Sequence, residues 1–429
     1  MRKLRILLSV LAAALCAYAQ NAPQHLDLRQ AEQIALRNNP RIGSAAFTAQ
    51  AAGQVPAELR SAYMPQVFGS VTGAGASDGT RIAAGGLNNP VIYDRLASGV
   101  TVSQMITDFG RTSNLVASAR LNAQARQQNT ETTRAGTILQ VDRAYFDLLR
   151  SENVFRVAQE TVKARQLVVD QVTALAQSKL KSTLDVSFAN VNLSEAKLLL
   201  ASAENGVKAA QATLSTAMGY PDEHSFTLAD EPMPSPVLDA PGALVQTALR
   251  SRPELADLRL QQGAEQRYAK AEHALWFPTI STVASAGYIP GRQPDQLLQN
   301  HYGAVGLNVN IPVLNGGLFS ARHTEAELRA QAAGKDVQDL ENRIARDVRV
   351  AYLNALTAYQ RVGLTAQMLD QARLALDLAN SRYQIGLGSI VELSQAQLNA
   401  TSAEIASVSA KYDYQTQRAL LDYETGTNR

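Results

Sequence analysis

The chain contains an internal repeat, which constrains its fold more than any other feature of the sequence. The segment Ala35–Pro40 recurs as Ala248–Pro253, 213 residues further along the chain. Later positions repeat at a distance of 207 residues, as Ser182 and Ser389 do. The change in spacing falls in a segment expected to be a loop, where insertions cost little. Two colinear halves with the same fold are therefore predicted.

We expect structural repeats at 20–219 and 242–429, joined by a proline-rich surface linker at 220–241. Each repeat is predicted to hold short helices, one β-hairpin and then two long helices. The predicted hairpins lie at 65–109 and 278–314, and the predicted long helices at 111–177, 184–218, 318–384 and 391–425. Gly219 and Gly426 are expected to end the returning helices as C-caps.

Long stretches of the chain lack the residues that end helices. Arg111–Gln177 contains one glycine and no proline, and Leu318–Tyr383 contains two glycines and no proline. Apolar residues recur there every three or four positions, the pattern of amphipathic helices in coiled-coil packing. About 67 helical residues would span roughly 100 Å. Aromatic residues are only 6% of the chain while alanine is abundant, which suits helices packed closely along their lengths.

The first nineteen residues are predicted to be a secretory signal peptide. Three basic residues precede the short apolar segment Ile6–Cys16, and Ala17–Ala19 then has the pattern of a cleavage site. A membrane anchor is the weaker interpretation, because the apolar segment is too short to cross a bilayer. Lipid attachment at Cys16 is also disfavoured, since Leu15 stands where a small residue is required. Cys16 is the only cysteine, which excludes a disulfide framework.

Four segments of about ten residues alternate between apolar and polar side chains. The alternation is clear at 100–106 and 305–313 and weaker at 66–75 and 279–288. This length and pattern are typical of transmembrane β-strands. Two ordinary hairpins on a soluble domain are the alternative. The duplicated pattern in an exported chain favours the membrane interpretation.

Four strands cannot close a barrel, and an open sheet edge is not tolerated in the hydrocarbon core of a membrane. More than one chain is therefore required, and three chains would supply twelve strands around a water-filled lumen. The predicted fold class is an α+β membrane protein, with an internally duplicated protomer, very long helices and four strands for a shared barrel. Tyr63, Trp276 and Phe277 precede the strands and are expected in an interfacial aromatic belt, with plain packing as the alternative.

Several motifs together give the chain a resemblance to a known family. They are Leu-x-Leu at 26–28 leading to Asn-Pro at 39–40, Ser-Ala-Tyr-x-Pro-Gln at 61–66, Ile-Pro-Val-Leu-Asn-Gly-Gly at 311–317, Arg-Tyr-x-x-Gly-x-x-Ser-x-x-Glu-Leu at 382–393, and Tyr-x-Tyr at 412–414 followed by Gly426. This set resembles the TolC-like outer membrane efflux protein family and covers almost the whole mature chain.

The resemblance implies a homotrimer with a twelve-stranded β-barrel in the outer membrane lipid and a helical tunnel in the periplasm. It also implies docking to a periplasmic adaptor protein and an inner-membrane pump, so that the channel passively conducts the substrates of a tripartite efflux system. A channel for type I protein secretion is an alternative, because the pump selects the cargo. A secreted helical scaffold or adhesin is the alternative from another functional class.

The resemblance also implies a gate at the periplasmic end of the tunnel. The matching positions are Asp185, Tyr383, Glu392 and Gln395. Carboxylates repeated around a narrow three-fold axis would attract cations. Gln395 stands where the archetype of the family has a second acidic ring, and Gly388 where it has a basic latching residue. We therefore expect a weakly latched gate, with a Tyr383–Asp185 contact as its main polar link. The alternative is that Asp185 and Glu392 only stabilise helix N-termini.

The turns between the long helices are expected to form the tips that dock the adaptor. They comprise Lys179, Leu180 and Lys181 in the first repeat and Gly386, Leu387 and Gly388 in the second. Lysine replaces the glycine of the family at the first turn, which puts the backbone conformation there in question. Solvated turn lysines are the alternative. The loops 76–95 and 289–300 are expected to face the exterior.

No constellation of residues indicates an enzyme. The five histidines show no metal-ligand spacing, and His273 and His323 are expected to be isolated in helices. The sequence contains neither a phosphate-binding glycine loop nor a nucleophile elbow. We expect no catalytic residues, cofactor or bound metal. The net charge of +2 gives no indication of a nucleic-acid partner.

Overall fold

A computed structural model describes residues 24–75, 77, 95–222, 224–237, 239–291 and 300–428. The predicted signal peptide at 1–19, including Cys16, lies outside the described residues. So do most of the predicted exterior loops at 76–95 and 289–300.

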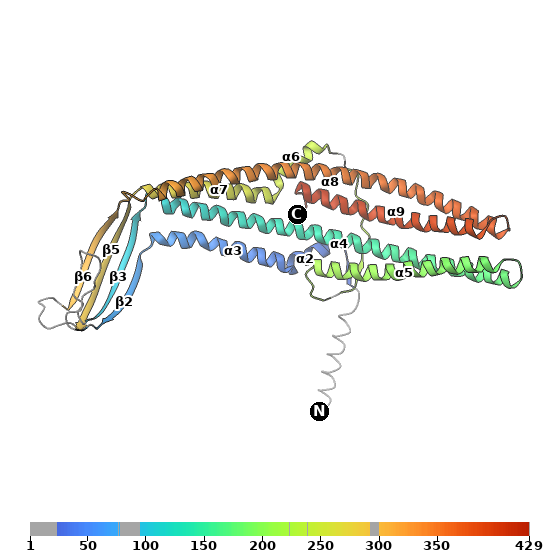
Figure 1. Ribbon diagram of the computed structural model, residues 1–429, viewed down its shortest axis with the longest axis horizontal. Helices are drawn as coiled ribbons and strands as arrows, with labels where there is room; N and C mark the ends of the chain where they lie inside the picture. Colours follow the sequence, from blue (N-terminus) through green and yellow to red (C-terminus); the bar gives the residue numbers. More distant parts are fainter. Residues whose placement is uncertain are drawn as a thin grey trace, which may run out of the picture. The chain divides into compact units, whose positions relative to one another are not determined.

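The order of helices and strands occurs twice along the chain (Figure 1). The first series is α2 (Leu28–Asn38), α3 (Pro40–Arg60), a 3-10 turn (Ser61–Tyr63), β2 (Gln66–Ala74), β3 (Arg95–Thr107), α4 (Arg111–Gln177) and α5 (Thr183–Ala217). The second is α6 (Pro241–Ser251), α7 (Pro253–His273), a 3-10 turn (Ala274–Trp276), β5 (Thr279–Gly291), β6 (His301–Asn310), α8 (Leu318–Gln384) and α9 (Ile390–Thr425). The predicted combination of very long helices with four strands is thus confirmed.

The compact units of the structure do not follow the two halves of the sequence. Unit 1 comprises the described parts of 1–45, 129–254 and 340–429, and unit 2 comprises those of 46–128 and 255–339. Both halves of the sequence contribute to each unit. Among the described residues, no helix has both the length and the apolar character needed to cross a membrane.

In unit 2, four antiparallel strands form one sheet in the order β2-β3-β5-β6 (Figure 1). The register places Val67, Val102, Ala284 and Val305 in one row across all four strands. Side chains alternate between faces along a strand, so this row and every second row from it lie on the same face of the sheet. That face is mainly apolar. The neighbouring row, which includes Thr101 and Ser285, lies on the opposite face and is more polar, with Phe68 as an exception.

In unit 1, the short strand β1 (Gln24–Leu26) pairs in parallel with β4 (Phe226–Leu228). These strands pack with α2, α4 and α5 around a core that contains Tyr145 and Leu214. The Tyr145 hydroxyl is 3.1 Å from the carbonyl oxygen of Leu26 and 2.7 Å from that of Ala229. The core therefore ties the start of the described chain to the segment that follows the first long hairpin.

A corner that occurs in both repeats joins each returning helix to a short helix pair. Gly219 follows α5 with φ +84° and Gly426 follows α9 with φ +71°, so both predicted glycine ends adopt the left-handed conformation. A Cβ on Gly219 would lie 2.8 Å from the carbonyl of Asn38, and one on Gly426 would lie 2.6 Å from Ser251 Oγ. Both glycines are required for close backbone approach as well as for helix termination.

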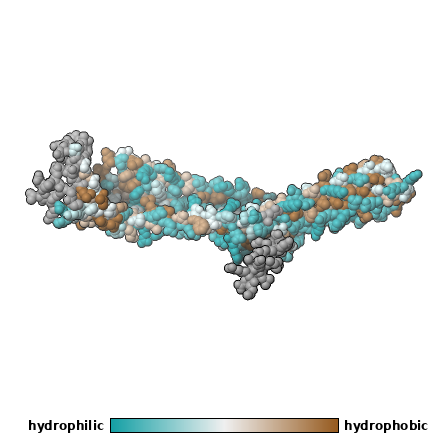
Figure 2. Space-filling model, turned by 90° about the horizontal axis from the view of Figure 1, so that it is seen from below, coloured by the Kyte–Doolittle hydropathy of each residue, from teal (hydrophilic) through white to brown (hydrophobic). Residues whose placement is uncertain are grey.

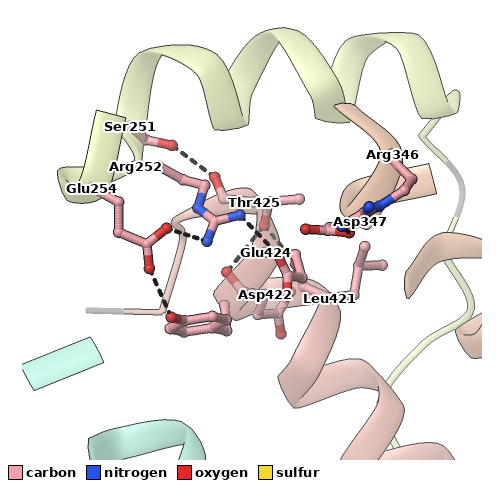
Figure 3. A network of polar contacts seen from close by, with 10 residues as sticks. Ser251, Arg252, Glu254, Arg346, Asp347, Leu421, Asp422, Glu424 and Thr425 are labelled. Carbon is pink, nitrogen blue, oxygen red and sulfur yellow. Dashed lines mark hydrogen bonds and ion pairs between the residues drawn. The ribbon is translucent and has the colours of Figure 1, made fainter. Parts of the chain in front are cut away.

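Polar contacts hold the two corners differently. In the first, Asn39 Nδ2 donates to the carbonyl of Ala217 at 3.1 Å. In the second, the matching residue is Arg252, which is buried and pairs with Glu424 at 2.7 Å and with Glu254 (Figure 3). A buried guanidinium between two carboxylates keeps its charge compensated, so the second corner is closed by an ionic network.

Candidate functional site

The turn between α4 and α5 is a Schellman motif in which a lysine takes the position that glycine usually occupies. Leu180 N donates to the carbonyl of Leu175 at 2.9 Å, and Lys179 N donates to that of Ala176 at 3.0 Å. Lys179 has φ +63°. The backbone at this position is therefore left-handed despite the Cβ of lysine, as in a glycine-terminated helix.

The turn between α8 and α9 repeats the same motif with glycine. Leu387 N donates to the carbonyl of Arg382 at 2.8 Å, and Gly386 has φ +80°. Leu387 and its counterpart Leu180 are each 71% exposed. The two turns therefore present one apolar side chain each at matching positions. In Figure 2, hydrophobic residues are interspersed among hydrophilic ones at the right-hand end, where these hairpins lie.

The helices after the turns begin with side-chain caps. Ser182 Oγ accepts from Leu184 N at 3.1 Å, and the carboxylate of Asp185 accepts from Ser182 N at 3.0 Å. Ser389 Oγ accepts from Glu392 N at 3.1 Å. Asp185 therefore closes a capping box at the start of α5, as the helix N-terminus interpretation expects.

The expected hydrogen bond between Tyr383 and Asp185 is absent, and that part of the prediction is wrong. Tyr383 is 6% exposed, and its hydroxyl has no hydrogen-bond partner among the described residues. The Asp185 carboxylate binds its own helix start instead. Lys181 Nζ lies 4.0 Å from the centroid of the Tyr383 ring, a cation–π contact. Burial, with a further contribution from the Asp185 charge, raises the pKa of Tyr383.

The second turn also holds an ion pair that no pattern in the sequence indicated. Arg382 Nε lies 3.4 Å from Glu392 Oε1. Arg382 belongs to the 382–393 motif, but Glu392 lies ten positions further along the chain, and only the turn geometry brings them together. Gln395 is exposed and donates to Asn399 Oδ1 at 3.0 Å. A Cβ on Gly388 would lie 3.1 Å from Tyr383 N, so the turn is too crowded to accept a side chain there easily.

The two helical hairpins pack together near their turns. Val172, Tyr383, Ile390 and Leu393 are buried in one apolar cluster. Nearby, Asn192 Nδ2 donates to Ser394 Oγ at 2.7 Å and links α5 to α9. The predicted gate residues Asp185, Tyr383 and Glu392 are therefore brought to the same end of unit 1 by packing between the two repeats.

One known protein family matches most of the chain. Residues 31–220 and 244–427 match the family described as outer membrane efflux protein. The chain belongs to this family. The match covers both repeats and omits the linker between them, as the repeated helix and strand order leads one to expect. Membership locates this efflux protein in the outer membrane, with its tunnel in the periplasm.

Relatives of this efflux protein are similar over most of their length. It is 24% identical to the outer membrane efflux protein BepC of Brucella suis, over 88% of this chain and 80% of the relative. It is 23% identical to the outer membrane protein TolC of Escherichia coli, over 94% and 82%. The structure of the outer-membrane channel OprN matches with a TM-score of 0.81 and 18% identity, over 93% of this chain and 89% of OprN.

In unit 2 of this efflux protein, aromatic residues cluster at the end of the sheet where β5 begins and β3 finishes. The rings of Trp276 and Phe319 are 6.1 Å apart, and those of Phe277 and Phe109 are 6.0 Å apart. The predicted belt residues Trp276 and Phe277 remain about half exposed, while Tyr63 is half-buried. The cluster also includes Phe109 and Phe319, which were not among the predicted belt residues.

The two helical histidines are not isolated, contrary to prediction. The His273 ring meets the His323 ring edge to face, with centroids 5.1 Å apart. Beside them, Arg322 Nε lies 2.8 Å from the buried carboxylate of Glu272. No group of three potential metal ligands occurs in the part of the chain that the structure describes.

Proposed function

We propose that this chain is the outer membrane exit channel of a tripartite efflux system, through which substrates pass passively. The observation that supports this function is the sheet of unit 2. It has an apolar face, and its edge strands β2 and β6 have no partner within the described chain. Val305 on that face is 83% exposed. A sheet with this face and two open edges requires both an apolar environment and neighbouring strands.

Three copies of the chain satisfy these requirements. Twelve strands would close a barrel with the apolar face outward and the polar face around the lumen. Apolar side chains are also exposed along the long helices, including Leu198 on α5 and Leu374 on α8. Such stripes fit packing between neighbouring helices of a ring. Family membership further favours the channel over a secreted scaffold or adhesin.

Planar bilayer recording of the purified full chain tests the channel. The expected result is stepwise conductance from a species that migrates as a trimer without heating and as a monomer after heating. A protein recovered only from the soluble periplasm, or a membrane protein without conductance, would refute the proposal. Retention of a small dye by cells that lack the channel then separates small-molecule efflux from protein secretion.

We also propose that Asp185, Glu392 and Gln395 line the constriction, with Tyr383 behind it. Their common position at one end of unit 1 supports this arrangement, while Arg382 reduces the field of Glu392. Gln395→Glu should increase block of the channel by a divalent cation, because each chain then adds a carboxylate. Gln127→Glu, which adds the same charge at an exposed position of α4, is the matched control. Equal block in the two variants would remove Gln395 from the constriction.

The two exposed turns are proposed to dock a periplasmic adaptor, which recruits the inner-membrane pump. Leu180 and Leu387 supply apolar anchors at matching positions, and buried apolar anchors usually dominate binding energy. Leu180→Asp with Leu387→Asp should abolish efflux in cells and leave bilayer conductance intact. Gln371→Asp, which adds the same charge at an exposed polar position of α8 away from the turns, is the control. Unchanged efflux in the double variant would exclude the turns as the docking site.

A further inference from the structure

A pocket of about 720 Å³ lies in unit 1, away from the turns. Its walls come from α2, α4, α6, α9 and the linker between the repeats. Leu28, Phe146 and Leu244 supply apolar surface to these walls. Asp422 and Thr425 also line the pocket and belong to the same helix end as the Arg252 network (Figure 3). The ionic corner therefore fixes one wall of the pocket.

Carboxyl groups predominate over basic groups in the pocket. The acidic residues are Glu32, Asp142, Glu231, Asp239 and Asp422, and the basic ones are Arg29 and Arg418. Arg418 is already engaged, since its Nε lies 3.5 Å from Asp422 Oδ1. The Glu231 carboxylate accepts from Leu28 N at 3.3 Å. Asp142 and Glu32 are joined by a side-chain hydrogen bond, so the acidity of the pocket is centred on this carboxyl pair.

Two buried acceptor atoms in the pocket have no donor among the described residues. Asp142 is 5% exposed and its Oδ1 is unpartnered. Gln415 is 2% exposed; its Nε2 donates to the carbonyl of Glu231 at 3.0 Å, while its Oε1 is unpartnered. Buried acceptors without donors are costly, and both side chains line this pocket. The pocket therefore presents sites for a ligand that donates hydrogen bonds.

The geometry points to a binding site for an organic ammonium ion with an apolar body. An ammonium group has three donors, enough for Asp142 Oδ1, Gln415 Oε1 and a neighbouring carboxylate. A metal ion fits less well, since no group of three potential ligands forms a metal site in the described chain. The apolar walls would contact the hydrocarbon part of the ligand, as in other small-molecule sites.

Proton release provides a specific signature of this binding. Burial raises the pKa of Asp142 to about 8, and the carboxylates of Glu32 and Asp422 raise it too. The charged groups that line the pocket with Asp142 are Arg29 and Glu32 on α2, Glu231 and Asp239 in the linker, and Arg418 and Asp422 on α9. An ammonium ion favours the ionised carboxylate. At pH 7, its binding therefore transfers the carboxyl proton to the buffer.

Titration calorimetry of the full-length protein in detergent tests the site, with 2-phenylethylammonium chloride up to 10 mM as the probe. 2-Phenylethanol, which has a similar body and no charge, is the matched ligand control. We expect the ammonium to bind at least tenfold more tightly than the alcohol. Binding heats in buffers of different ionisation enthalpy should show up to one proton released per chain at pH 7. Affinity should increase between pH 6 and pH 8.

Asp142→Asn keeps the shape of the side chain and removes the charge. It should weaken binding at least tenfold and eliminate the proton release. Asp370→Asn, which removes an exposed carboxylate on α8 outside the pocket, should bind like the parent chain. Glu32→Gln serves as a second variant if Asp142→Asn does not fold, and it should weaken binding several-fold.

Three results would each overturn the site. They are equal affinity for the ammonium and the alcohol, unchanged affinity in both pocket variants, and binding without release of a proton at pH 7. The readout requires neither conductance nor a pump. A failure here would therefore leave the proposed channel function unaffected, and a protein without conductance could still contain the site.

Discussion

At the scale of single residues, Lys179 and Gly386 show the same backbone conformation with different side chains. Both residues have positive φ. The residue type alone did not predict this conformation at Lys179, since lysine rarely adopts it. The repeat predicted the position of this turn, because Lys179 lies 207 residues before Gly386. The backbone conformation at Lys179 stayed in question until the structure showed it. By contrast, nothing in the residue pattern predicted Arg382 beside Glu392 or Lys181 over Tyr383, because these contacts depend on packing between helices.

Lys179→Gly should stabilise the first turn by about 1 kcal/mol, because glycine avoids the cost of a Cβ in the left-handed region. The unfolded chain gains some entropy with glycine, which limits the gain. The thermal unfolding midpoint of the purified protein measures the effect. Lys179→Asn, which tolerates the same conformation, should give a smaller increase. A lower midpoint for Lys179→Gly would contradict a strained turn.

Asp142→Asn should make stability less dependent on pH. The ordinary pKa of an aspartate is 3.8, whereas burial raises the pKa of Asp142 to about 8. Between these values the folded state holds a proton that the unfolded chain has lost, so stability falls as pH rises. The loss amounts to about 1.4 kcal/mol per unit of pKa difference. The variant should therefore melt higher than the parent at pH 8 and show a smaller difference at pH 5.

A comparison of melting at pH 5 and pH 8 checks this sign. Asp370→Asn, which changes an exposed aspartate, should follow the parent chain at both values. A melting difference between Asp142→Asn and the parent that does not grow from pH 5 to pH 8 would show that Asp142 does not retain its proton in the folded state.

At the scale of helices and strands, the corners after α5 and α9 are built alike and held differently. The helix periodicity and the glycines were sufficient to predict where α5 and α9 end. They were insufficient to predict what the glycines contact, because Asn38 and Ser251 lie far away in the sequence. The ionic network of Arg252 was likewise hidden, since its partner Glu424 is 172 residues away.

Gly219→Ala should destabilise the chain more than Gly386→Ala. Both glycines have positive φ, so both variants carry a cost of about 1 kcal/mol from the backbone. Only at Gly219 would the new Cβ lie 2.8 Å from the Asn38 carbonyl, whereas nothing lies within 4 Å at Gly386. Midpoints of thermal unfolding for the two variants measure the steric part. Equal midpoints would show that the backbone near Asn38 shifts to accept the new Cβ without loss of stability.

At the scale of the whole molecule, the fold class followed from patterns that extend over tens of residues. Breaker-free stretches predicted the helices, and alternation predicted the strands. The sequence did not show that each compact unit takes segments from both halves, because this depends on the pairing of β3 with β5. Placement of the gate residues required the same long-range packing, and the acidic pocket had no local signal at all.

Two adjacent residues of β6 test which face of the sheet contacts lipid. Val305 and Ala304 belong to neighbouring rows and point to opposite faces. Val305→Arg should impair assembly in the outer membrane, because arginine at the lipid face costs about 2–4 kcal/mol at the bilayer midplane. Ala304→Arg should assemble and change ion selectivity instead. The amount of heat-modifiable trimer in outer membrane fractions is measured for both variants. Loss of the trimer in Ala304→Arg but not in Val305→Arg would show that the other face of the sheet contacts lipid.

The two turns, alike in backbone and unlike in side chain, give the proposed ring a particular symmetry. A trimer would carry six near-equivalent turns around its periplasmic rim, with lysine and glycine alternating. Any protein that caps this rim meets two kinds of site in strict alternation. A hexameric cap of identical subunits would have to bind each kind with half of its members, whereas a cap of three duplicated subunits would match the rim one to one.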